Sequence, residues 1–430
     1  MPWAPVVNAH GTIRRRRLFL HSSVDRLHAD RACPLAGKEI PSMKRLASAA
    51  FFTFVIFAVA LPAFSETLVV GTCQPARHPY ATIQAAVDAA RPRATILVCP
   101  GTYAEQVVIT TPLTLKGISA PPLPNPTIVG PAAGVAGGPV IGVATHGTLG
   151  PVNIQGLVIN DPNCMGESNN ISAIQYVSTS GAVTGTVIQG FGDPECGGYG
   201  ILVENDDAWP VNVELANNII REFQPYGTAF ELTSGPSSSR LNVQIHDNLL
   251  YDIPTALESS TNGNGVWMYG NSIGTFDIGT FPVVVNDAAM IDHNEISLSA
   301  TSTENAAIAI EANGNGAVIT GNTITTSGSY ATGIDVTGDH VRVWSNKITG
   351  NAMGATHGIG VGIFTGSASS DIRWNTIDGF LGGIDMGCQA ATVVSNTILD
   401  STTGIVGVPQ AAPPMNNNFL NDTNLLQTCP

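Results

Sequence analysis

Basic residues are scarce in this chain. Its 430 residues include 18 Lys and Arg against 32 Asp and Glu, a formal net charge of −14. Half of the basic residues lie in the first 65 positions, so residues 66–430 contain nine basic and 29 acidic residues, a formal charge of −20. This charge repels nucleic acid and anionic membrane surfaces, so we expect no nucleic-acid partner, and binding of a polyanion would need a divalent cation.

Long charged helical segments and a regular leucine pattern are also absent, which excludes helical and leucine-rich repeats. The main apolar run, residues 46–61, follows Met43-Lys44-Arg45 and precedes small residues, a pattern typical of a secretory signal peptide. We therefore expect a signal peptide at 43–65, an upstream extension from a misassigned start at 1–42, and no stable membrane span after cleavage. The alternatives are an uncleaved anchor and, for the Arg-rich extension, a targeting or nucleic-acid arm.

A short phrase centred on asparagine recurs through the C-terminal half of the chain. An apolar residue stands three positions before each asparagine and another usually stands two positions after it, as in Val343-Trp344-Ser345-Asn346-Lys347-Ile348. Successive asparagines are 21 to 30 residues apart, which indicates a solenoid. They are Asn218, Asn248, Asn271, Asn294, Asn322, Asn346, Asn375 and Asn396.

The residues around each asparagine alternate between apolar and polar, which predicts strands, and Gly, Ser, Thr, Asn and Asp fill the gaps, which suits turns. One coil of a parallel β-helix needs about this many residues. We therefore predict an all-β fold, a right-handed parallel β-helix of about a dozen coils over residues 66–430 as a single domain. The asparagine amides are expected to bond backbone groups and one another along the stack, a structural role rather than a catalytic one.

Residues 79–117 differ from the rest of this domain and are expected to form its N-terminal cap and first coils. The segment Pro79–Ala90 has apolar positions at helical spacing, which predicts a helix over the open end of the solenoid. A strand follows this helix, and after it come two short segments, Pro100-Gly101-Thr102-Tyr103-Ala104-Glu105 and Leu113-Thr114-Leu115-Lys116-Gly117. This order resembles the opening of the pectin lyase-like superfamily, which includes pectin methylesterases and right-handed β-helix repeat proteins. The resemblance implies polysaccharide lyase, glycoside hydrolase or epimerase chemistry, although the catalytic motifs of pectin methylesterases and polygalacturonases are not found.

Six cysteines follow the predicted signal peptide, and none has the CxxC spacing of a zinc site. An even number in an exported chain indicates disulfides, with fifteen connectivities open in principle. Because a solenoid contacts mainly its sequence neighbours, we predict the pairs Cys73 with Cys99, Cys164 with Cys196, and Cys388 with Cys429.

Acidic residues form an outward column when the strands are aligned by the asparagine spacing. The column contains Glu231, Glu258, Asp335 and Asp385, with Glu311 two residues along its strand. Asp335 and Asp385 would stand two coils, about 9.6 Å, apart, near the carboxylate separation of inverting glycosidases. Alternatively, Glu311 and Asp335 could share a Ca²⁺ ion, the one cofactor that we consider, for an acidic sugar. The third interpretation is a solvated acidic surface.

A second outward face precedes each asparagine. Aromatic rings beside charged groups suit sugar binding there, because C–H faces stack on rings while hydroxyls take the polar groups. His340 and His357 are candidate general bases without an evident partner. The candidate substrate-binding residues are Trp267, Tyr269, Arg342, Trp344 and Arg373, with His246 and Asp292 beside them.

These observations predict a secreted, extracellular or periplasmic monomer. Its partner would be a polysaccharide or cell-surface glycan, which it binds along its lateral face and, in the catalytic version of the hypothesis, cleaves or modifies with Glu311, Asp335 and Asp385. The alternative is a non-catalytic surface or adhesive protein whose regular coil is itself the functional product.

Overall fold

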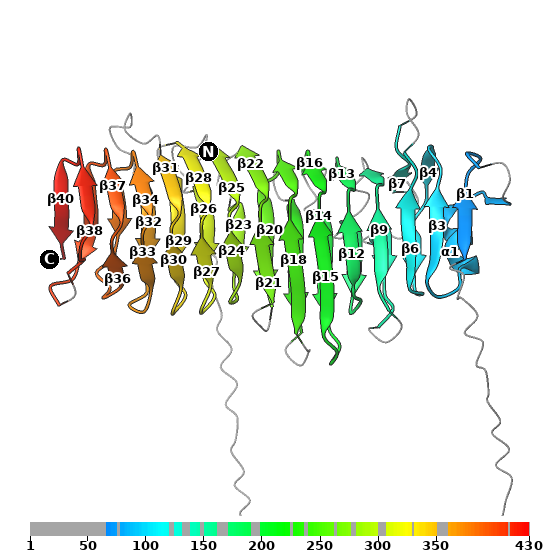
Figure 1. The fold of residues 1–430 in the computed structure, drawn as a ribbon, viewed down its shortest axis with the longest axis horizontal. Helices are drawn as coiled ribbons and strands as arrows, with labels where there is room; N and C mark the ends of the chain where they lie inside the picture. The colour runs from blue at the N-terminus through cyan, green and yellow to red at the C-terminus, as the bar shows by residue number, and fades with distance from the viewer. Residues whose placement is uncertain are drawn as a thin grey trace, which may run out of the picture. The chain divides into compact units, whose positions relative to one another are not determined.

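The strands of the chain follow one another around a coil that repeats along a single axis (Figure 1). The computed structural model describes residues 66–74, 78–119, 124–130, 138–146, 150–160, 171–190, 198–223, 227–235, 240–261, 265–276, 281–299, 307–328, 331–350, 360–411 and 413–429. The predicted signal peptide and upstream extension, Cys164, Cys196 and His357 lie outside these ranges.

Three long parallel sheets line the coil. The first sheet has 14 strands, in the order β2 (Pro79–Tyr80), β1 (Thr67–Val70), β3 (Ala94–Val98), β6 (Leu113–Gly117), β9 (Val152–Gln155), β12 (Gly181–Thr184), β15 (Val211–Ala216), β18 (Leu241–His246), β21 (Val266–Tyr269), β24 (Met290–Asp292), β27 (Val318–Thr320), β30 (Arg342–Trp344), β33 (Asp371–Arg373) and β36 (Thr392–Val394).

The second sheet has 13 strands, in the order β39 (Asn418–Leu420), β37 (Thr397–Leu399), β34 (Thr376–Asp378), β31 (Lys347–Gly350), β28 (Thr323–Ser327), β25 (Glu295–Ser299), β22 (Ser272–Phe276), β19 (Leu249–Tyr251), β16 (Ile219–Arg221), β13 (Val187–Gln189), β10 (Val158–Asn160), β7 (Thr127–Val129) and β4 (Thr102–Ala104).

The third sheet also has 13 strands, in the order β40 (Asn424–Thr428), β38 (Thr403–Val408), β35 (Gly382–Asp385), β32 (Val361–Thr365), β29 (Ala331–Val336), β26 (Ala307–Ala312), β23 (Val283–Val285), β20 (Thr255–Ser260), β17 (Thr228–Ser234), β14 (Gly198–Asn205), β11 (Ile171–Val177), β8 (Ile141–Val143) and β5 (Val107–Ile109). Each strand pairs with the strand one coil away, so the predicted parallel β-helix is confirmed, while its handedness stays a prediction.

Apolar side chains from all three sheets fill the interior of the coil. In the first sheet Ile245, Met268 and Ile291 pair in register and are fully buried. Burying one such side chain stabilises the fold by about 1.5–3 kcal/mol. The residues that alternate with them along each strand face outward. The outward residues of neighbouring coils are therefore also in register, one coil apart.

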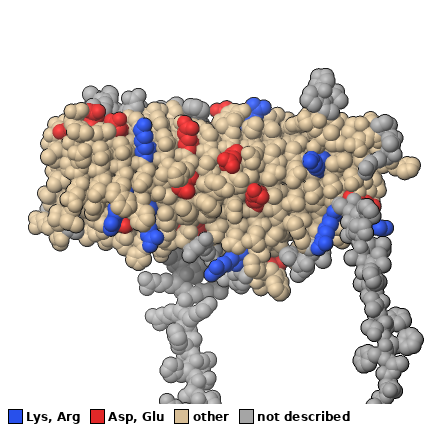
Figure 2. All heavy atoms as spheres, viewed as in Figure 1, with Lys and Arg blue, Asp and Glu red and all other residues tan. Residues whose placement is uncertain are grey.

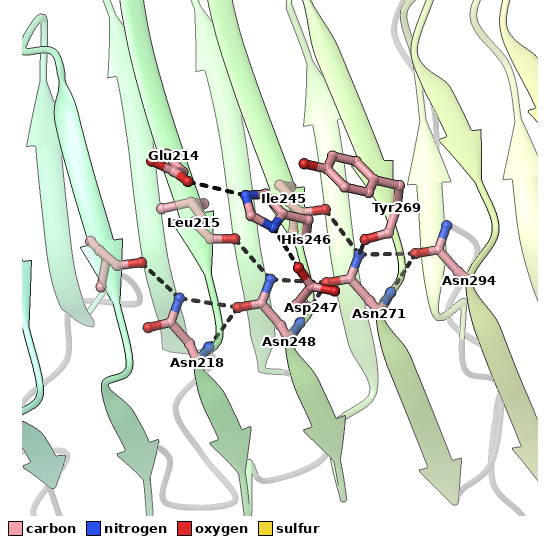
Figure 3. Close-up of polar contacts among 11 residues, drawn as sticks. Glu214, Leu215, Asn218, Ile245, His246, Asp247, Asn248, Tyr269, Asn271 and Asn294 are labelled. Atoms are coloured by element: carbon pink, nitrogen blue, oxygen red, sulfur yellow. Dashed lines mark hydrogen bonds and ion pairs between the residues drawn. The ribbon is translucent and has the colours of Figure 1, made fainter.

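The asparagines form a continuous hydrogen-bonded row at the corner between the first and second sheets (Figure 3). Asn248 Oδ1 accepts from the backbone N–H of Asn218 at 2.9 Å and from its Nδ2 at 3.0 Å. Asn248 Nδ2 also donates to the Leu215 carbonyl at 2.8 Å. The row extends to Asn417, which was not predicted from the sequence. These bonds satisfy buried polar groups at the tight corner.

The residue before each asparagine of the row has a left-handed backbone conformation, with φ between 50° and 65°. Gly, Asn, Asp, Ser and His, which are small or can bond locally, occupy most of these positions, as this conformation favours. The exception in size is Trp374, at φ 57°. The full set is Asn217, Asp247, Gly270, His293, Gly321, Ser345, Trp374, Ser395 and Asn416.

The N-terminal end carries α1 (Ile83–Ala89), the one helix in the described ranges (Figure 1). Thr82 is its N-cap and accepts from the Ala85 N–H at 3.2 Å, while Glu105 accepts from the N–H groups of Ile83 and Gln84 at 2.8 and 3.0 Å. Ile83 and Val87 are buried against the end of the core.

Two of the three predicted disulfides are confirmed. Cys73 is bonded to Cys99 and Cys388 to Cys429, with Cα–Cα distances of 5.6 and 5.8 Å. They lie near the first and last coils. Among the described residues there is no helix with the length and apolar character needed to span a bilayer.

Candidate functional site

The predicted acidic column lies on the outer face of the third sheet. The pairing runs without a break from Leu202 to Asp385 and includes the four predicted members, Glu311 and three apolar residues. One placement was wrong: Glu311 pairs directly with Asp335, not two residues along the strand, because β26 is aligned with β29 through Ile310 and Ile334. The column reads Leu202, Glu231, Glu258, Val284, Glu311, Asp335, Phe364 and Asp385.

A cavity of about 230 Å³ opens on the N-terminal part of this face. It lies over three of the longest strands, β11, β14 and β17, with seven, eight and seven residues. Long paired strands keep outward side chains at fixed spacings of one coil and of two residues along a strand. The lining residues are Ser172, Gln175, Tyr199, Leu202, Glu204, Glu231 and Thr233.

Glu231 has the most perturbed carboxyl group of this cavity. Burial, and then the charges of Glu258 and Glu204, raise its pKa to about 8 from an ordinary value of 4.5. Its Oε2 atom is buried and has no hydrogen-bond partner among the described residues. At neutral pH this carboxyl is therefore mostly protonated, the state required of a general acid.

Glu204 and Tyr199 also line this cavity. Glu204 Oε2 accepts a hydrogen bond of 2.7 Å from Gln175 Nε2, which orients the second carboxylate. Burial, followed by the charges of Glu231, Glu258 and Glu204, raises the pKa of Tyr199, so its hydroxyl keeps its proton and can donate. The cavity thus combines a protonated acid, a second carboxylate and neutral hydrogen-bonding groups.

Gln175, Tyr199 and Glu204 were not predicted from the sequence. The asparagine phrase begins at Asn218, and these residues belong to earlier coils. In the coil of β14 the corner position is taken by Thr186, whose N–H donates to Asn218 Oδ1 at 3.0 Å, so the asparagine phrase is absent there. The alternating pattern of β14 itself was the available signal.

The predicted catalytic residues lie farther along the same column. Burial, then the charge of Glu311, raises the pKa of Asp335 to about 6. Asp335 Oδ1 is buried without a partner in the described part of the chain. Asp385 is two coils away, as expected, but Phe364 lies between the two aspartates. Asp385 Oδ1 accepts from the Gly387 N–H at 2.9 Å. The catalytic roles stay predictions.

The predicted Ca²⁺ ligands are neighbours, because Glu311 pairs with Asp335. Glu311 Oε1 also accepts from Asn313 Nδ2 at 2.9 Å. Ca²⁺ needs six to eight oxygen ligands. Within the described ranges no group of three or more His, Cys, Asp and Glu residues could hold a metal ion, and the Ca²⁺ site at this pair stays a prediction.

The aromatic residues predicted on the first sheet lie on its outer face in two adjacent columns. Trp267 and Arg342 belong to one column, together with Glu214 and Gln244. The other column contains His246, Tyr269, Asp292, Trp344 and Arg373.

The N-terminal part of these columns is built around His246 (Figure 3). Its ring stacks on that of Tyr269, with 4.8 Å between the ring centroids and 10° between the ring planes. The centroids of the Trp267 and Tyr269 rings are 4.4 Å apart. Nδ1 lies 2.8 Å from Asp247 Oδ2 and Nε2 lies 3.1 Å from Glu214 Oε1. These contacts hold the imidazole and the phenol in a fixed aromatic surface.

The C-terminal part gathers two arginines on two tryptophans. Arg342 lies 5.4 Å from the Trp344 ring centroid, and Arg373 lies 6.0 Å from that of Trp374. The two indoles meet edge to face, with centroids 6.1 Å apart and planes at 65°. Trp374 was missed because its place directly before an asparagine is that of a turn residue.

The comparisons with known proteins give only distant likenesses. No family model and no curated protein matches the chain. DFA-IIIase from Arthrobacter chlorophenolicus in complex with DFA-III is 14% identical, covers 83% of this chain and 84% of its own, with a TM-score of 0.40. A lacto-N-biosidase from Eubacterium ramulus is 12% identical over 84% of this chain and 68% of its own chain, with a TM-score of 0.49. The surface protein and adhesin PfbA of Streptococcus pneumoniae is 13% identical over 80% of this chain and 94% of its own chain, with a TM-score of 0.37.

Proposed function

We propose that the protein binds a polysaccharide on the outer face of the third sheet and cleaves it at the cavity around Glu231. The observation that carries this proposal is a carboxyl group with a pKa of about 8 in a cavity that also contains a second carboxylate. Glycoside hydrolysis uses such a pair, one group protonated and one ionised.

In this mechanism Glu231 donates its proton to the glycosidic oxygen as the leaving group departs. Glu204, oriented by Gln175, is the carboxylate that activates water or attacks the sugar. Tyr199 and the neighbouring hydroxyl groups hold sugar hydroxyls by hydrogen bonds. An extended sheet face beside the cavity lets a chain polymer pass along it, which favours an internal bond as the point of attack.

The test is to incubate the protein with a panel of neutral and uronate polysaccharides, with and without Ca²⁺, and to measure new chain ends. We expect cleavage of at least one polymer, lost in Glu231→Gln. A Glu311→Gln variant is the matched control, since Glu311 lies in the same column but does not line the cavity. Cleavage that persists unchanged in Glu231→Gln contradicts the proposal.

A second candidate function is a non-catalytic glycan-binding surface protein. The observation that favours it is the aromatic face of the first sheet, where Trp267 and Trp374 are 39% and 55% exposed. Binding to a polysaccharide of the panel without any new chain ends, in the wild type, supports this function over the first.

A further inference from the structure

Trp374 occupies a backbone position that a bulky residue adopts only at a cost. Its φ of 57° is in the left-handed region, where a Cβ and a large ring are disfavoured. Eight equivalent corners along the asparagine row contain Gly, Asn, Asp, Ser or His. The fold therefore does not need an indole at this corner, and a smaller residue would satisfy it better.

The surroundings of Trp374 do not compensate by burial. The side chain is 55% exposed, so it contributes little to the core. Its neighbour Trp344 carries a second cost, because the indole Nε1–H is buried and has no hydrogen-bond partner among the described residues. Two unfavourable features at one exposed cluster indicate selection for a role other than stability.

The cluster of Trp344, Trp374, Arg342 and Arg373 has the composition of a sugar-binding surface. Two indoles at 65° offer a face and an edge for the C–H surface of a sugar. The guanidinium groups of Arg342 and Arg373 lie over these indoles and present N–H groups for hydroxyl oxygens. Arg373 also donates from Nε to Asp371, which orients it.

Charge selects the class of saccharide. The chain carries a formal net charge of −14, and most of the surface in Figure 2 is uncharged, with basic side chains scattered over it. A polyanion would be repelled by the molecule as a whole, and Asp371 offsets one of the two arginines. A neutral glycan meets no such repulsion.

We propose that Trp344, Trp374 and Arg342 form a binding site for neutral polysaccharides on the first sheet, separate from the third-sheet cavity, and that Trp374 is held in a left-handed conformation to present its indole. The site binds and does not cleave. It would hold a polymer or a glycan-coated surface while the cavity acts on another segment.

The experiment compares Trp374→Asn with Ser345→Asn, both in a Glu231→Gln background of the full chain so that cleavage cannot remove the ligand. Asparagine is native at two equivalent corners, Asn217 and Asn416, so both variants should fold. The neutral probes are a soluble β-glucan, a mannan and a galactan. Polygalacturonate is the anionic probe. Affinity electrophoresis and tryptophan fluorescence measure binding, and thermal unfolding measures stability.

We expect Trp374→Asn to weaken binding of a neutral polysaccharide about tenfold, through loss of the stacking surface. Because strain is released, its Tm should rise by roughly 1–3 °C. Ser345→Asn, one coil away at the same corner, should leave affinity unchanged.

Three results would overturn the proposal: no binding of any neutral polymer by the Glu231→Gln parent, unchanged affinity in Trp374→Asn, or salt-sensitive binding of polygalacturonate alone. A lower Tm together with unchanged affinity would identify Trp374 as a packing residue. Because the assay scores binding and not cleavage, it can fail or succeed independently of the proposed catalytic cavity.

Discussion

Two acidic regions share one column of the third sheet but differ in their surroundings. In the N-terminal region Glu231 lines a cavity beside Glu204 and Tyr199, and its pKa is raised to about 8. In the C-terminal region Asp335 stands beside Glu311 with a pKa raised to about 6, and Phe364 separates it from Asp385.

The two regions share the cause of their raised carboxyl pKa values. Both regions have a buried carboxyl oxygen without a partner among the described residues, and in both burial comes before like charge as the cause of the shift. The N-terminal region combines that shift with a cavity and with a second carboxylate oriented by an amide. Glu231 is therefore the stronger candidate for the catalytic acid, because the cavity gives a ligand room beside it.

Removing the acid from each region in turn should produce the largest contrast. Glu231→Gln is expected to reduce cleavage by roughly 10²–10⁴-fold, because the leaving oxygen loses its proton donor. The double variant Asp335→Ala and Asp385→Ala should keep at least half of the wild-type rate. Release of new chain ends measures both. If the double variant loses more activity than Glu231→Gln, the catalytic residues lie in the C-terminal region.

The two regions should also differ in how pH affects stability. A carboxyl whose folded pKa lies above its unfolded value binds its proton more tightly in the folded state, so stability falls as pH rises between the two values. For Glu231 that window runs from 4.5 to about 8, and for Asp335 from 3.8 to about 6.

Denaturation at a series of pH values tests these windows. Glu231→Gln should stabilise the protein increasingly up to about pH 8, whereas the gain from Asp335→Asn should level off near pH 6. Parallel profiles for both variants would mean that the two sites have the same environment.

Neutralising a neighbour should move the pH dependence of cleavage. Glu258 raises the pKa of Glu231, so Glu258→Gln should lower that pKa and shift the alkaline limb of the rate profile to lower pH. Glu311→Gln, its counterpart in the C-terminal region, should leave the limb where it is. An unmoved limb in Glu258→Gln would remove Glu231 from the role of acid.

The smallest effect is expected at the cavity wall. Tyr199→Phe removes one hydroxyl and should raise KM severalfold with little change in kcat, since it loses a hydrogen bond that ground state and transition state share. Steady-state kinetics measure KM and kcat separately. A fall in kcat equal to that of Glu231→Gln would instead assign Tyr199 to the chemistry.

The fold was largely predictable because its signal is repeated. The asparagine phrase marks eight coils, and the inward Ile, Val and Leu positions around it identified the strands and hence the outward column. The same spacing failed by two residues at Glu311, because Ala307-Ile308 resembles the small and apolar pair of the neighbouring strands, whereas Ile310 is the residue that pairs with Ile334. Asn417 was missed because Asn416 and Asn418 flank it and hide the phrase.

The sequence by itself determined the coil, its disulfides at Cys73–Cys99 and Cys388–Cys429, and which residues face outward, because each depends on local alternation and on contacts one coil away. Only the tertiary structure decided which outward residues meet. A cavity, a buried carboxyl oxygen and an indole held in a left-handed turn depend on side chains from several coils, 20 to 30 residues apart, packed to a definite depth. Alternation gives the direction of a side chain, whereas depth and proximity set its pKa.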